Sequence, residues 1–264
     1  METKKYKLTD ETINVYGRTL YRIEALRDFS GVKKGDKGGY IEKEENLSQN
    51  GNCWVYDDAM VFEDARIYGN ARVYDKAKVF DNAWVCDNAW VCDNAEVYGK
   101  ALVYGYAQVY GDAVVYGNAR VYGYARVYDY AEVYDKAWVY GNAEVFNNAQ
   151  VYCNALVIDN ARVYSNAKVC DNAMVRGKAN VYSHAEVCGN AEIATDSDYI
   201  VFKNWWSSGR GCTWTKSNNM WKVGFFYGTG EELIEEAYED SEKTGEEYEK
   251  FVKYVESIIR NGTI

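Results

Sequence analysis

A six-residue pattern of small and branched apolar residues runs through the middle of the chain. Every sixth residue from Val55 to Ile193 is Val or Ile, and an Ala stands two positions before each of them from Val61 onward. Side chains two positions apart lie on the same side of a strand, so both residues are predicted to face inward from very short strands. A helix is excluded for this region, because a period of six does not repeat on a helix of about 3.6 residues per turn.

Two turn residues, most often Gly or Asp followed by Asn, close each repeat. These residue types adopt the left-handed backbone conformation that a tight corner needs. Strands this short are stable only when the repeats stack, so that each backbone N–H and C=O group pairs with a neighbouring coil. The sequence contains no proline, as expected for such a ladder, since proline lacks the backbone donor.

The repeat resembles that of the hexapeptide-repeat proteins, which fold as left-handed parallel β-helices. Their pattern places a small residue four positions after an aliphatic one, as in Val61 and Ala65 or Val103 and Ala107. The resemblance implies three strands, about 18 residues, in each triangular coil. We therefore predict a mainly β protein with a left-handed parallel β-helix of about eight coils over residues 51–194.

A solenoid needs caps, because its end coils expose unpaired strand edges. Residues 1–50 are predicted to form an N-terminal β cap, with a hairpin over residues 13–23 that turns near Gly17. Ile41 and Leu47 are in phase with the Ala positions of later repeats, which suggests imperfect first coils. This N-terminal stretch resembles that of uncharacterised bacterial and prophage hexapeptide-repeat proteins.

After Ile193 the period stops, and residues 195–264 are predicted to form a small α+β module. Residues 199–206 and 221–227 have the pattern of two strands around a loop. Two helices follow, with capping boxes predicted at Thr229 to Glu232 and at Thr244 to Glu247. The second helix carries an apolar stripe for packing, made of Tyr248, Phe251, Val252, Val255 and Ile258.

The loop and strands of this module hold the chain's one non-repetitive group of aromatic, cationic and amide residues. Aromatic faces beside cations suit a nucleobase and its phosphates. The predicted ligand-binding residues are Trp205, Trp206, Arg210, Trp214, Lys216, Asn218 and Trp221. The alternative is that the tryptophans form the core of the module.

The outward side chains differ among the three predicted faces. Residues 18 apart stack, so the Tyr that often follows each Val forms a ladder that either stiffens the sheet or offers a platform for stacking bases. The position between Ala and Val is rich in apolar residues on one face only, with Trp84, Leu102, Trp138, Leu156 and Met174. We predict that another subunit or the C-terminal helices cover this face, and the family resemblance implies a homotrimer.

Charge and cysteine content narrow the function classes. With 30 Lys and Arg against 40 Asp and Glu, and no basic stripe, nucleic-acid binding is not expected. The seven cysteines include no CxxC pair and there is one histidine, so neither a metal site nor a cofactor is predicted. The sequence shows no apolar signal region and no membrane-spanning stretch, which predicts a reducing, cytoplasmic setting without membrane partners. Cys170 and Cys188, neighbours on adjacent coils, are expected to remain reduced thiols.

Three functions are open at this stage. Many hexapeptide-repeat proteins are acyltransferases with a His as general base, and His184 is the sole candidate here. However, it occupies a corner position that usually holds Asn, and no insertion interrupts the repeats to shape a substrate site, so no catalytic residue is predicted. We favour a non-catalytic binding protein, a rigid oligomeric rod whose C-terminal module sequesters a small nucleotide-like defence signal, by analogy with prophage relatives. A structural or protein-interaction rod is the third hypothesis.

Overall fold

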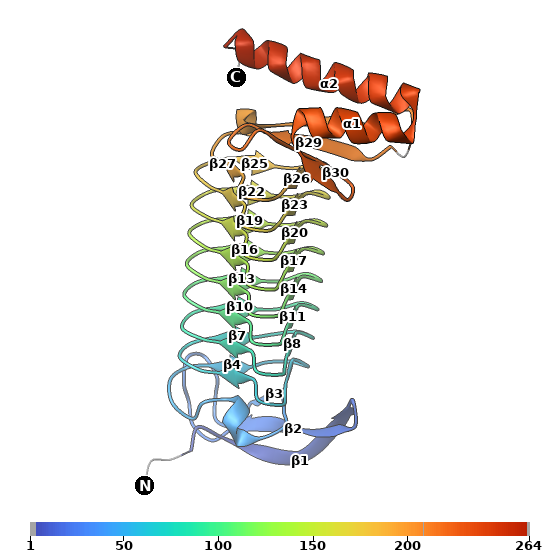
Figure 1. Ribbon diagram of the computed structural model, residues 1–264. Helices are drawn as coiled ribbons and strands as arrows, with labels where there is room; N and C mark the ends of the chain where they lie inside the picture. The colour runs from blue at the N-terminus through green and yellow to red at the C-terminus, as the bar shows by residue number, and fades with distance from the viewer. Residues whose placement is uncertain (1–3, 208, 263–264) are drawn as a thin grey trace.

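A column of stacked coils with a cap at each end makes up the chain in a computed structural model that describes residues 4–207 and 209–262 (Figure 1). Twenty-four two-residue strands form the column, from β4 (Trp54–Val55) to β27 (Glu192–Ile193), and each ends at a Val or Ile of the repeat. Each strand pairs in parallel with the strand three places along, which gives three sheets and eight coils, with a partial ninth at the N-terminal end. The predicted mainly β solenoid is confirmed. Residues 1–3 of the predicted cap, Ser208 of the predicted loop and residues 263–264 of the predicted module lie outside the described residues.

The interior of the column is filled by the alanines and the valines of the repeat, whose exposed fractions do not exceed 1%. The first corner residue of each repeat has a positive φ, as at Asp57 (50°) and Gly189 (68°), which confirms the left-handed corner. Where this residue is Asp, its carboxylate accepts a hydrogen bond from the backbone of the corner one coil further on. Asp93 accepts such a bond from the N–H of Gly111 at 2.8 Å. The repeated carboxylates are therefore structural acceptors for backbone groups.

Backbone hydrogen bonds between coils run in both directions, as in any parallel ladder. The N–H groups of the residues on either side of each repeat Val donate to the next coil toward the C-terminus. Examples are the bonds from Trp54 to Ala71 (3.1 Å) and from Met174 to Ala191 (2.8 Å). In the parallel register the N–H of the repeat Val points to the preceding coil instead. Each end of the column therefore presents both N–H and C=O groups to its cap.

Aromatic ladders run along the outside of the column, as predicted. On one face, the rings of Tyr110, Tyr128, Phe146 and Tyr164 lie parallel, with neighbouring centroids 4.8–4.9 Å apart. Because each ring covers the face of the next, the inner rings have no free face on which a base could stack. The ladders therefore stiffen the sheets.

The N-terminal cap consists of β1 (Tyr6–Val15), β2 (Arg18–Ala25), β3 (Lys37–Ile41) and the short 3₁₀ helix η1 (Glu44–Asn46). β1 and β2 form the predicted hairpin, and β3 adds to the sheet of the column beside β5 (Met60–Val61). The predicted imperfect coil is present, but the positions predicted for Ile41 and Leu47 within its repeat are wrong. Ile41 lies beside Val61, and Leu47 lies beside Ile67, so both take the Val position rather than the Ala position. The offset is 20 residues instead of 18, because eight residues rather than six separate Leu47 from Val55, the next position of this kind.

A four-stranded antiparallel sheet lies on the last coil (Figure 1). Its strands are β28 (Tyr199–Lys203), β29 (Gly211–Thr215), β30 (Met220–Val223) and β31 (Phe226–Gly228), and the 3₁₀ helix η2 (Asp196–Asp198) leads into it. The prediction of two strands around a loop is wrong in part, because β29 lies in the predicted loop and the second predicted strand is the hairpin β30–β31. The last four residues of β29 are all buried, so the alternation that marks a half-buried strand is absent there.

Two helices, α1 (Gly230–Asp240) and α2 (Glu242–Arg260), follow the sheet. The capping box at Thr229 and Glu232 is confirmed. The second predicted box is wrong. Ser241 is the N-cap of α2 and accepts a hydrogen bond from the Thr244 N–H at 3.2 Å, because a single residue separates the two helices.

The apolar stripe of α2 packs, as predicted, against the four-stranded sheet and α1. The prediction that the helices cover the apolar face of the column is wrong, since η2 leads directly from β27 into β28 and holds the whole module at the end of the column (Figure 1). On that face Trp84 and Trp138 are 42% and 36% exposed, while Leu102, Leu156 and Met174 are half-buried.

Candidate functional site

The C-terminal module is joined to the column through the N–H groups that the last coil leaves unpaired. In earlier coils these groups donate to an Ala carbonyl of the next coil. Here a side chain of the module accepts instead, once in each of the three sheets. The acceptors are Asp196 for the N–H of Asn180 (2.6 Å), Thr213 for Glu186 (2.9 Å) and Ser217 for Glu192 (2.7 Å). These bonds hold the module against the column.

A cleft of about 760 Å³ opens at this junction. One wall is the last-coil corner at residues 182–184, and the other is β28 with the start of β29. The two walls approach closely at Gly211, where a Cβ atom would lie 2.8 Å from the carbonyl oxygen of His184. A side chain at position 211 would therefore push the sheet away from the corner.

The cleft lining combines aromatic rings with a few polar groups. Tyr182 is 44% exposed, and Phe202 and Tyr199 extend the aromatic surface. The Tyr199 hydroxyl donates to the carbonyl of Asn180 at 2.9 Å, and burial raises its pKa, so it remains a neutral donor. Within the described part of the chain, no carboxylate pairs with Lys203, which supplies positive charge to the lining.

His184 lies exposed between two hollows. It lines the junction cleft and also a smaller pocket of about 300 Å³, together with Arg210 and Glu186. The same corner position one coil earlier holds Asn166, so the sequence correctly assigns His184 to an ordinary corner. What the sequence did not predict is that this corner faces the module.

Two of the predicted ligand-binding tryptophans lie in the core of the module. Trp214 and Trp221 are 1% and 2% exposed and pack with Leu233, Tyr248 and Val252. This is the arrangement that the alternative interpretation describes, and it leaves these rings no surface for a ligand. Their role is to hold the sheet against α1 and α2.

The other predicted residues fall into two groups at opposite ends of β29. Trp205, Trp206 and Arg210 lie near its start, whereas Lys216 and Asn218 lie in the turn after its end, about 14 Å away along an extended strand. In the first group Trp206 packs against α2, with its ring 5.1 Å from that of Tyr248, and Trp205 is exposed. In the second group the Asn218 amide donates to the Tyr227 hydroxyl at 3.1 Å. The structure does not bring the seven residues into one site.

The cleft residues Tyr182, Ser183, Tyr199, Phe202 and Lys203 were absent from the prediction. One feature of the sequence indicates where this cleft lies. The only histidine replaces a corner Asn in the last coil, directly before the period ends at Ile193. A module that follows the end of a solenoid must rest on the corners of its last coil.

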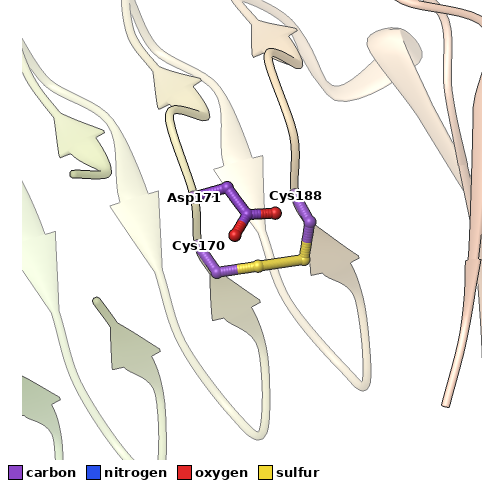
Figure 2. A group of neighbouring side chains, drawn as sticks. All are labelled: Cys170, Asp171 and Cys188. Carbon is purple, nitrogen blue, oxygen red and sulfur yellow. A yellow bond between two sulfur atoms is a disulfide. The ribbon is translucent and has the colours of Figure 1, made fainter. Parts of the chain in front are cut away.

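The prediction that Cys170 and Cys188 are reduced thiols is wrong, because the structure joins them in a disulfide (Figure 2). They are the only two cysteines of the sequence that lie 18 residues apart. The parallel register therefore stacks them, with Cα atoms 4.7 Å apart, within the range of disulfides. The sequence analysis placed the two cysteines on adjacent coils correctly, but it expected a reducing compartment to keep them as thiols.

Among the residues that the structure describes, two groups of side chains have the composition of a metal site. Cys170, Asp171 and Cys188 form the first, and Asp75, Cys92 and Asp93 form the second. In the second group, burial followed by the charges of Asp93 and Asp75 raises the pKa of the Cys92 thiol to about 11. A metal ion at this group would have to displace the thiol proton, and the group offers one sulfur ligand where the first group offers two.

Among the described helices, none has both the length and the apolar character that a membrane crossing requires.

Comparison with known proteins finds similarity in the coils. A family model described as YdcK beta solenoid repeat matches residues 65–79, 107–123 and 115–129. The chain is also 50% identical over 38 residues to a protein of Escherichia coli strain K12 named "Uncharacterized acetyltransferase YdcK". That stretch is 14% of this chain and spans only 12% of the relative's length. With its stacked six-residue repeats and these matches, the chain is a hexapeptide-repeat-like β-helix protein.

Proposed function

We propose that this protein is a non-catalytic binding protein, in which the rigid β-helix presents the junction cleft to a small aromatic ligand that carries negative charge. The observation that carries the proposal is the lining of the cleft. The rings of Tyr182 and Phe202 lie in the same hollow as Lys203 and His184. A base can stack on an aromatic ring while a phosphate meets the Lys203 ammonium, so a nucleotide-like ligand fits this lining. The volume of about 760 Å³ lies within the usual range of ligand pockets.

The surroundings of His184 support binding rather than catalysis. A histidine base is normally oriented by a hydrogen bond to a third group. Within residues 4–207 and 209–262, no carboxylate pairs with His184. The one carboxylate of the cleft lining, Asp196, is engaged with the backbone of Asn180 as part of the cap.

Calorimetric titration of the full chain with nucleoside mono- and diphosphates tests the proposal. Lys203→Gln removes the cation of the cleft, and Tyr182→Ala removes an exposed ring, so each should weaken binding by about tenfold or more. Lys216→Gln is the matched control, since it removes a cation in the turn at the other end of β29 and should leave the affinity unchanged. Recovery of the ligand unaltered after incubation would support sequestration. Absence of binding, or equal loss with Lys216→Gln, would contradict the proposed site.

Acetyl transfer is a second candidate, which two observations favour: the name of the Escherichia coli relative and the position of His184 in a cleft. Release of free thiol from acetyl-CoA in the presence of amine acceptors measures this activity. His184→Asn restores the residue type that Asn166 provides one coil earlier, so it removes the base with little change in packing. Turnover that is lost in this variant would replace the non-catalytic proposal.

We also propose that copies of the chain associate through the apolar face of the column. The supporting observation is the exposure of Trp84 and Trp138 on this face. Trp84→Glu should lower the mass measured by light scattering to that of a single chain. Trp90, which is also 42% exposed but lies on another face, provides the control, and Trp90→Glu should leave the assembly intact. A monomeric wild-type chain would contradict the proposal.

A further inference from the structure

The two stacked cysteines have a third potential ligand beside them. Figure 2 shows the carboxylate of Asp171 over the gap that the disulfide between Cys170 and Cys188 spans. The ligand atoms of the three residues all lie within 4.8 Å of one another. One carboxylate oxygen of Asp171 accepts a hydrogen bond from the backbone N–H of Gly189 at 2.9 Å, which fixes the side chain in this position.

We propose that, when the disulfide is reduced, Cys170, Cys188 and Asp171 bind a zinc ion, with a fourth position open to water. Two thiolates and one carboxylate are ligands that Zn²⁺ prefers, and three protein ligands plus water make a common tetrahedral site. This proposal is independent of the junction cleft.

The geometry of the column favours this site. A tetrahedral zinc ion with Zn–S bonds of about 2.3 Å places its sulfur ligands about 3.8 Å apart. The Cα atoms of the two cysteines are held 4.7 Å apart by the hydrogen-bonded coils. Free sulfur atoms on these side chains can therefore reach that separation by side-chain rotation, without movement of the backbone.

The two cysteines are buried and the aspartate is exposed, so the thiolates would be shielded while one side of the metal ion stays open to water. The cysteines are 4% and 3% exposed, whereas Asp171 is exposed and forms the open side. The Tyr227 hydroxyl lies at the rim of the group and donates to the backbone carbonyl of Cys188 at 3.4 Å.

The redox step is balanced by a dithiol reductant. The reductant supplies two electrons and two protons, the S–S bond breaks, two thiols form, and the reductant closes to a cyclic disulfide. Zn²⁺ then replaces the two thiol protons, which pass to solvent. Metal binding and disulfide formation are thus alternative states of the same two sulfur atoms.

Cobalt substitution tests the proposal with a direct optical readout. The full chain is reduced with a water-soluble phosphine under anaerobic conditions, freed of reductant, and titrated with Co²⁺ and then Zn²⁺. We expect a thiolate-to-cobalt charge-transfer band and tetrahedral visible bands that saturate at one Co²⁺ per chain and disappear as Zn²⁺ displaces it. The disulfide form should give neither band. No band in the reduced protein, or the same bands in the disulfide form, would overturn the proposal.

Variants assign the ligands. Asp171→Asn keeps both cysteines and a side-chain acceptor for Gly189, so it should form the disulfide normally but bind metal at least about tenfold more weakly. Cys170→Ser should abolish the bands, and Cys188→Ala provides a second test if that variant folds poorly by circular dichroism. Cys92→Ser removes the thiol of the other acidic group and should leave binding unchanged. Unaltered affinity in Asp171→Asn, or loss of the bands in Cys92→Ser, would contradict the site.

Discussion

The two ends of the column are capped by different segments, and each cap supplies both donors and acceptors. At the N-terminal end the Lys5 ammonium donates to the Cys53 carbonyl at 2.9 Å, and the Asn46 amide donates to that of Ala65 at 2.9 Å. The Glu42 carboxylate accepts there from the Glu63 N–H at 2.6 Å. At the C-terminal end the acceptors are Asp196, Thr213 and Ser217, and the Tyr199 hydroxyl donates to the Asn180 carbonyl.

Both caps need both kinds of group because of the geometry of a parallel ladder. Each strand residue points its N–H and C=O groups to the same neighbouring coil, and successive residues alternate between the two neighbours, so an end coil leaves donors and acceptors on one edge. The ends differ in where the capping groups come from. At one end they come from the segment before the first full coil, and at the other from the module after the last coil.

The ends also differ in how far their cores join the column. Trp54, Tyr6 and Phe29 of the N-terminal end belong to the same continuous core as the alanines and valines of the coils. The C-terminal module has its own core around Trp214 and Trp221, while Tyr199 of β28 belongs to the core of the column and Val201 packs on it. The first cap is thus an extension of the column, and the second is a module attached to it.

The largest expected effect on the free energy of unfolding comes from removing one buried tryptophan from either core. Trp54 is 1% exposed, and its ring lies 5.3 Å from that of Phe29, so Trp54→Ala should lower the free energy of unfolding of the cap and the column together by about 3–5 kcal/mol. Trp214→Ala should cost a similar amount but unfold only the module. Urea unfolding combined with amide hydrogen exchange distinguishes the outcomes. Loss of protection in the coils of Trp214→Ala would show that the cores are not separate.

A smaller effect is expected for a single capping bond. Thr213 is 1% exposed, so Thr213→Val keeps the shape of the side chain but leaves the Glu186 N–H without its acceptor, at a cost of about 1–3 kcal/mol. The amide of Glu186 should exchange faster with solvent. Ser217→Ala removes the equivalent acceptor at an exposed position, where water can replace it, and should cost about 1 kcal/mol or less. Equal costs for both variants would contradict the role of burial.

The smallest effect is a dependence of stability on pH at the N-terminal end. Burial lowers the pKa of Lys5 below its ordinary value of 10.5, although the nearby Cys53 opposes this shift. Between the folded and the unfolded pKa, the unfolded chain binds more protons, so the free energy of unfolding rises with pH in this window. The stability of the wild type relative to Lys5→Met should therefore increase as the pH rises toward the ordinary lysine pKa, measured up to about pH 9.5, below the pH at which tyrosines ionise. A constant difference would indicate that Lys5 keeps its ordinary pKa.

The pattern in the sequence was sufficient for the column because each coil repeats one local rule. Val61 and Ala65 face inward for the same reason as their counterparts in every other repeat, and the offset of 18 follows from three strands per coil. The rule does not extend beyond Ile193. β29 escaped prediction because both of its faces are buried, and the start of α2 was misplaced because Ser241 serves as its cap.

The candidate site was less predictable, since its residues meet only through the packing of the module on the last coil. The sequence identified a cluster of tryptophans and cations, but the fold places Trp214 and Trp221 inside and separates Lys216 from Arg210. The cleft instead uses Tyr182 and His184 of the column together with Phe202 and Lys203 of the module. No spacing along the chain relates these two pairs.

The sequence by itself determined which side chains lie inside the coils and which lie above one another, because both follow from a period that repeats without interruption. It therefore also contained the stacking of Cys170 on Cys188, although their bonding was misjudged. Only the tertiary structure decided how the two ends are covered, which aromatic rings are buried and where a cleft opens. These features depend on contacts between segments without a common period, and such contacts are selected by the packing and hydrogen-bond requirements of the whole assembled chain.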